Sequence, residues 1–137
     1  MPAPELGRSF RKGLGVNLLM RDVDEGVRFA RDVLGATILH ADQDFAAIGY
    51  GESVWMLHRD QTYRGNAVLG LVDGLEDRGA GIELRVYGCL PDDAEARARA
   101  GGFTVLAGSI DKPHGLRECH IVGPSFYVFV PSLAIGG

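Results

Sequence analysis

Two charged side chains, Glu83 and Arg85, stand two residues apart in the run Gly81 to Val86, in which apolar and charged residues alternate. A period of two is typical of a β-strand with one buried face, so both charges are expected on the other face. Charged groups lining a cleft need partners from the protein, water or a ligand. We predict that Glu83 and Arg85 recognise a ligand; the alternative is a cleft wall in which Glu83 pairs with Arg85 or Arg117.

Other residues with reactive side chains lack the spacing that their chemistry needs. Cys119 precedes His120, but neighbouring strand residues point to opposite faces, so a thiol–imidazole pair is not expected. Cys89 and Cys119 show no Cys-x-x-Cys or zinc-ligand spacing. The glycines of Gly13-Leu14-Gly15 lack the strand-to-helix context of a dinucleotide site. We predict no nucleophilic, zinc or dinucleotide site at these positions.

The surrounding residues predict short strands and two helices. Val16 to Met20 is predicted to form a strand, and Asp22 to cap a helix that ends near Leu34, before Gly35. Apolar residues recur along that helix every three or four positions, at Val23, Val27, Ala30 and Leu34. Three strands are expected to follow, at Thr37 to His40, Phe45 to Tyr50 and Ser53 to His58.

The second half of the chain repeats the first. Gly15 to Leu18 matches Gly81 to Leu84 at an offset of 66 residues, Gly35 to Leu39 matches Gly102 to Leu106 at 67, and Gly51 to Trp55 matches Gly123 to Tyr127 at 72. Pro91 is expected to open the second helix, because the first helical position needs no N–H donor. The repeat predicts two βαβββ units.

One such unit is too small to bury its own sheet, so we predict an α+β fold in which two tandem βαβββ modules form a curved mixed sheet around a shared cleft. The expected divisions are an N-terminal arm at 1–13, a first module at 14–60, a linker at 61–80, a second module at 81–131 and a tail at 132–137. Together they are expected to make one structural domain.

Strand alternation assigns residues to the two faces of the sheet. Expected to face the helices are Val16, Leu18, Met20, Ile82, Leu84 and Val86. Trp55 and Tyr127 occupy equivalent places in the two repeats and are also expected on the helix side, as core residues; the alternative is that they form aromatic cleft walls that stack on a planar ligand. The predicted ligand-binding cleft is lined by Asn17, Leu19, Met56, His58, Glu83, Arg85, His114, Val128 and Val130.

Beyond the tandem modules, two segments resemble the vicinal oxygen chelate superfamily: the helix end Asp32-Val33-Leu34-Gly35 and the run Pro113 to Glu118. This superfamily includes glyoxalase I, extradiol dioxygenases and bleomycin-resistance proteins. The run to Glu118, followed by Gly123-Pro124-Ser125 where the family usually has Asp-Pro-Asp-Gly, is most similar to the bleomycin-resistance and glyoxalase-like branch. The resemblance covers about residues 14 to 131 and places His114 in a loop at the cleft mouth.

The resemblance implies four positions for the ligands of one divalent metal ion. They fall on Gly15, His58, Gly81 and Val130, so one of the four carries a ligand side chain. A catalytic site needs about three protein ligands, and we therefore expect no metal cofactor. The alternative is a register shift of two residues, which would bring Asn17 and Glu83 beside His58 and allow one divalent metal ion.

Composition narrows the class of partner. The 137 residues include 14 Lys and Arg against 18 Asp and Glu, a formal net charge of -4 that attracts neither nucleic acid nor anionic membranes. No apolar stretch is long enough to span a bilayer, and the N-terminal residues lack the apolar segment of an export signal. With two unpaired cysteines, a cytoplasmic location is expected.

These inferences favour a glyoxalase/bleomycin-resistance-like protein that binds a small apolar or aromatic molecule in its cleft without the usual family metal. The alternative is a metal-dependent lyase, isomerase or dioxygenase that uses His58 and Glu83. A third class, a structural or regulatory protein, predicts no enclosed ligand. The resemblance also implies a homodimer.

Overall fold

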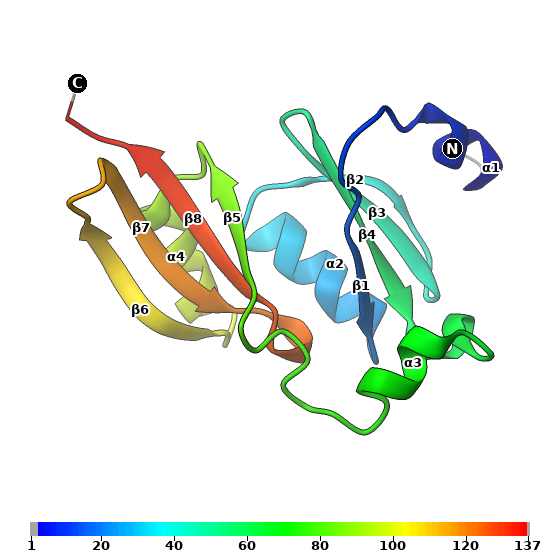
Figure 1. Ribbon diagram of the computed structural model, residues 1–137. Helices are drawn as coiled ribbons and strands as arrows, with labels where there is room; N and C mark the ends of the chain where they lie inside the picture. The colour runs from blue at the N-terminus through cyan, green and yellow to red at the C-terminus, as the bar shows by residue number, and fades with distance from the viewer. Residues whose placement is uncertain (1–2, 137) are drawn as a thin grey trace.

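Two βαβββ modules lie side by side in the computed structural model, which describes residues 3–136 (Figure 1). The first comprises β1 (Asn17–Met20), α2 (Val23–Asp32), β2 (Thr37–Ala41), β3 (Phe45–Tyr50) and β4 (Ser53–Arg59). The second comprises β5 (Glu83–Tyr87), α4 (Pro91–Ala100), β6 (Thr104–Asp111), β7 (Leu116–Val122) and β8 (Val128–Ala134). The predicted α+β fold of tandem βαβββ modules is confirmed.

Helix α2 begins directly after its predicted cap, Asp22, and ends at Asp32, two residues before the predicted end at Leu34. The Asp22 carboxylate accepts a hydrogen bond from the Glu25 backbone N–H at 3.2 Å, which satisfies one of the unpaired donors of the first turn. Gly35 follows the helix with φ of 72°, a left-handed conformation that favours glycine. All four residues of the predicted apolar stripe are buried, namely Val23, Val27, Ala30 and Leu34.

Each module forms its own four-stranded sheet. The strand orders are β1-β4-β3-β2 and β5-β8-β7-β6, with β1 parallel to β4, β5 parallel to β8 and the other neighbours antiparallel. The mixed sheet predicted around the cleft consists of two four-stranded sheets, one from each module, with β1 and β5 as edge strands. The space between these two edges becomes important for the site.

The helix-covered sides of the two modules share one core. Helix α2 lies between the two sheets (Figure 1), and its Phe29 packs against Phe129 of β8 with ring centroids 5.1 Å apart. Tyr127 is buried in this core, as predicted, whereas Trp55 is partly buried against it and also lines the groove between the modules. Ile82 was expected there but is 47% exposed, because β5 begins only at Glu83.

Two short helices and two 3-10 turns complete the described part of the chain. Helix α1 (Ala3–Ser9) docks through Leu6, which is 5% exposed. The predicted linker is organised as the 3-10 turn η1 (Asp60–Tyr63) and helix α3 (Ala67–Val72), and a second 3-10 turn, η2 (Pro124–Phe126), precedes β8. No helix between residues 3 and 136 has the length and apolar character to cross a membrane.

Candidate functional site

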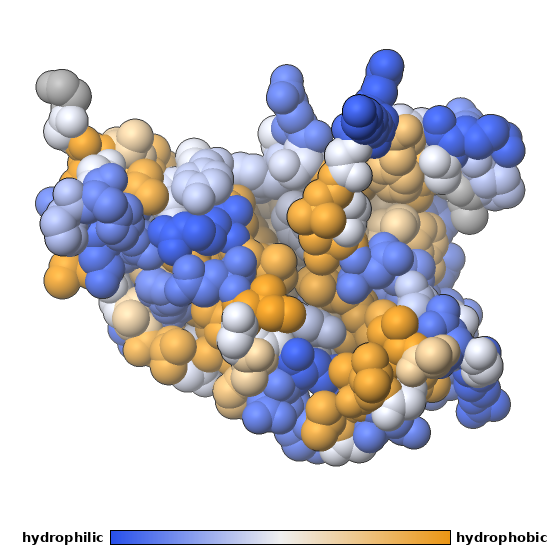
Figure 2. Space-filling model, in the orientation of Figure 1, coloured by the Kyte–Doolittle hydropathy of each residue, from blue (hydrophilic) through white to orange (hydrophobic). Residues whose placement is uncertain are grey.

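A groove of about 1100 Å³ separates the two modules. One wall is the edge strand β5 with Phe129 behind it, and the other is formed by the start of β1 and the hairpin between β3 and β4. Residues 10–16, which lead from α1 into β1, also line it. The groove belongs to the hollow between the halves of the molecule in Figure 2.

Aromatic and aliphatic side chains make up much of the groove wall. Trp55, the only tryptophan of the chain, lies with its ring centroid 6.2 Å from that of Phe129. Tyr50 and Leu84 also line the groove. Flat aromatic faces of this kind can stack on a planar apolar ligand.

Glu83 and Arg85 form the charged part of the β5 wall and are bonded to each other. The Arg85 guanidinium donates to Glu83 Oε1 and to Glu118 Oε2, both at 2.9 Å, and is 3.4 Å from the Ser132 hydroxyl. Of the two partners considered for Glu83, Arg85 is therefore correct; Arg117 pairs instead with two aspartates, Asp92 and Asp111.

Two histidines extend this ion-pair network across the face of the second sheet. Nε2 of His120 lies 3.0 Å from Glu83 Oε2, and Nε2 of His114 lies 2.7 Å from Glu118 Oε1. Hydrogen bonds from His120 and Arg85 lower the pKa of Glu83. Burial alone would raise the pKa of Glu118, but hydrogen bonds and charge from Arg85 and His114 outweigh it and lower that pKa. Both carboxylates are thus held ionised at neutral pH.

Sequence reasoning did not identify Glu118 and His120 as network members. Their spacing of two residues on β7 places them on one face, while the intervening Cys119 is buried on the helix side. That alternation was the available signal. Cys119 and His120 therefore lie on opposite faces of β7, and burial raises the pKa of the Cys119 thiol to about 11.

The nine predicted cleft residues do not all lie in the groove. Asn17, Met56, Glu83 and Arg85 line the groove. Leu19 and Val130 are buried, at 4% and 0% exposure, and do not line it. His58 packs with aromatic residues of its own module, Val128 lies beside Glu83 in the β5–β8 ladder, and His114 holds Glu118. Their role in ligand binding stays a prediction.

Comparison with solved structures finds the same architecture at low sequence identity. A glyoxalase/bleomycin resistance protein/dioxygenase from Nocardioides is 20% identical, with 98% of this chain and 92% of that chain covered and a TM-score of 0.68. A family enzyme of the same description from Burkholderia phytofirmans PsJN is 18% identical, covering 88% and 97% with a TM-score of 0.72. This chain has the glyoxalase/bleomycin-resistance fold.

A third neighbour with this fold is a glyoxalase-related enzyme from Fulvimarina pelagi, 13% identical, with 90% of this chain and 88% of that chain covered and a TM-score of 0.70. No protein-family model and no curated protein matches the sequence. The comparisons therefore show the fold alone.

The side chains at the four metal positions implied by the glyoxalase/bleomycin-resistance resemblance do not fit a divalent ion. Gly15 and Gly81 offer no donor and Val130 is apolar. Both Glu83 oxygens already accept hydrogen bonds, and Glu83 lies in the other sheet from His58. Within residues 3–136, no three His, Cys, Asp or Glu side chains are grouped so that they could hold a metal ion.

His58 lies between two aromatic rings on the first sheet. Its ring stacks on Phe45 at 5.4 Å and lies 5.1 Å from Tyr63, whose hydroxyl accepts a hydrogen bond from Asn17 Nδ2 at 3.3 Å. The His58 Nε2 atom is buried and has no hydrogen-bond partner among the described residues. This burial disfavours the charged ring and lowers the pKa of His58.

We expect His58 to make the fold less stable in mild acid. Its folded-state pKa is below the ordinary 6.5, so the unfolded chain binds the proton more readily, and the stabilisation present above pH 6.5 is lost as the pH falls through the lowered pKa. The slope contributed by one group is at most about 1.4 kcal/mol per pH unit. Urea unfolding of the wild type and of His58→Phe between pH 5 and 8 measures it; equal slopes in the two proteins would refute the assignment.

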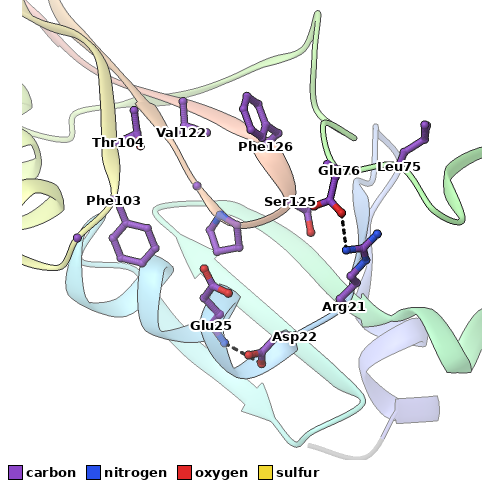
Figure 3. Close-up of a pocket in the computed structure, with 13 residues that line it drawn as sticks. Arg21, Asp22, Glu25, Leu75, Glu76, Phe103, Thr104, Val122, Ser125 and Phe126 are labelled. Carbon is purple, nitrogen blue, oxygen red and sulfur yellow. Dashed lines mark hydrogen bonds and ion pairs between the residues drawn. The ribbon is translucent and has the colours of Figure 1, made fainter.

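A smaller cavity of about 340 Å³ lies at the N-terminal end of α2, bounded by η2 and the start of β6 (Figure 3). Its charges are largely engaged, because Arg21 pairs with Glu76 at 2.9 Å and Asp22 caps α2. The consecutive residues Ser125 and Phe126 have φ of 59° and 65°, an uncommon backbone conformation for non-glycine residues. The groove between the modules is the candidate site, because it is the larger of these two cavities and its wall carries the Glu83–Arg85 pair.

Proposed function

We propose that the protein binds a small, largely apolar or aromatic molecule in the groove between its modules, without a metal ion. The groove itself carries this proposal. Its volume of about 1100 Å³ is slightly above the range of roughly 300–1,000 Å³ that is usual for small-molecule sites. Aromatic walls with a few fixed polar groups are also usual for such sites.

The charged wall supports binding that does not use a metal. The Arg85 guanidinium lies between Glu83 and Glu118 and supplies the positive charge that two ionised carboxylates require. A metal-dependent lyase, isomerase or dioxygenase using His58 and Glu83 would need Glu83 to leave both Arg85 and His120. A homodimer and a cytoplasmic location remain predictions from the sequence.

The direct test uses Trp55 as the reporter of an apolar probe, N-phenyl-1-naphthylamine. Chelator-treated protein is expected to bind the probe saturably, with energy transfer from Trp55 to the probe. Leu84→Gln should weaken binding about tenfold, because the partly buried Leu84 forms part of the apolar wall and contributes at most the roughly 1.5–3 kcal/mol of a fully buried leucine. Leu106→Gln, at a 64% exposed position on β6, should leave binding unchanged.

Two results would contradict the proposal. One is equal weakening by Leu84→Gln and Leu106→Gln, which would place the probe outside the groove. The other is binding that appears only when a divalent metal is added back to the chelated protein. Circular dichroism of each variant verifies that the compared proteins are folded.

A further inference from the structure

The charge of the groove differs in sign from the charge of the whole chain. The protein carries a formal net charge of -4, yet three basic side chains line the groove, Arg11, Lys12 and Arg85, against two acidic ones, Glu52 and Glu83. Arg11 and Lys12 are exposed and therefore partly screened by water, but charges gathered along one groove act together on a ligand bound there. The local excess of positive charge therefore bears on the ligand more than the net charge does.

The positive charge that is free to bind a ligand comes from the N-terminal segment. Arg85 is neutralised by Glu83 and Glu118, both 2.9 Å away. The ion pairs formed within residues 3–136 involve neither Arg11 nor Lys12. Among the described residues, the groove lining thus has two cations outside any ion pair, Arg11 and Lys12, and one such anion, Glu52.

Helix α1 fixes the place of these two cations. Leu6 is 5% exposed and itself lines the groove, and the Ser9 hydroxyl donates to the Leu6 carbonyl at 2.6 Å, which closes the last turn of the helix. The chain that leaves this turn carries Arg11 and Lys12 along the groove and enters β1 at Asn17. The aromatic wall and the two cations therefore line one continuous cavity.

We propose that the ligand of the groove is an amphipathic anion, with an apolar or aromatic body against Trp55 and Leu84 and an oxyanion head, such as a carboxylate, sulfonate or phosphate, at Arg11 and Lys12. This inference rests on the proposed function and adds the sign of the ligand's charge. Guanidinium and ammonium groups bind oxyanions through charge-assisted hydrogen bonds.

Two probes that differ by one sulfonate test the charge preference. 8-Anilinonaphthalene-1-sulfonate carries the anionic head, and N-phenyl-1-naphthylamine has the same ring system without it. Energy transfer from Trp55 measures both affinities. The double variant Arg11→Gln/Lys12→Gln is expected to weaken the sulfonate probe about fivefold to tenfold at low salt and to leave the neutral probe within about twofold.

The matched control is Arg8→Gln/Arg64→Gln, which removes the same net charge at two exposed positions outside the groove lining. It should leave both affinities unchanged. Equal weakening of the sulfonate probe by the two double variants would show a long-range charge effect and overturn the inference, as would equal wild-type affinity for the two probes. If neither probe receives energy from Trp55, the proposed function itself fails.

Discussion

Replacing Arg78 with methionine is expected to lower the free energy of unfolding by about 3–5 kcal/mol, the usual cost of removing one partner of a buried ion pair. The Arg78 side chain is 1% exposed and donates to the two carboxylate oxygens of Asp60 at 2.6 and 2.8 Å. A third bond joins its Nε to the Leu75 carbonyl at 3.2 Å. Without Arg78, the Asp60 carboxylate would remain partly buried without its countercharge.

Urea denaturation at pH 7 measures this loss, and Arg21→Met provides the control. Arg21 pairs with Glu76 at 2.9 Å, but both side chains are more than half exposed, so its loss should cost less than about 1 kcal/mol. If the two variants had the same free energy of unfolding, burial of the Arg78–Asp60 pair would not account for its predicted contribution to stability. The chemical change is the same in both variants, so a difference between them reports burial.

The sequence predicted the modules because their limits depend on short-range signals. A capping aspartate at Asp22, a left-handed glycine at Gly35 and a period-two alternation at Glu83 and Arg85 act within a few residues. The repeat then supplied the tandem arrangement. Each signal fixes local backbone geometry or the face of a strand, and this is the part of the fold that the structure confirms.

What covers a face was not predictable in the same way. Alternation places the Leu19 side chain on the face opposite the helices, but it does not predict that Leu19 is only 4% exposed there. Tyr63, which packs against His58, belongs to the segment predicted only as a linker. Arg78 and Asp60 are 18 residues apart, and no periodicity links them. The candidate site was therefore predicted in its β5 wall and missed in the network members Glu118 and His120.

Replacing Phe29 with alanine is expected to cost about 3–5 kcal/mol, the range for a buried phenylalanine truncated in a core. Phe29 is 1% exposed, and its ring contacts Phe103 edge-on at 5.0 Å and Phe129 at 5.1 Å. Since Phe29 belongs to α2 and both partners to the second module, the cavity left behind would lie at the contact between the modules. Thermal unfolding should show the loss as one cooperative transition.

The control is Phe126→Ala, at a 50% exposed position, which should cost far less. Phe129 connects the stability effect to the groove, because one ring contacts Phe29 and also lines the site. Folded Phe29→Ala protein is therefore expected to bind N-phenyl-1-naphthylamine more weakly than the wild type, and Phe29→Leu, which refills part of the volume, should recover part of both losses. Stability that falls without any change in probe affinity would show that the groove wall does not depend on the shared core.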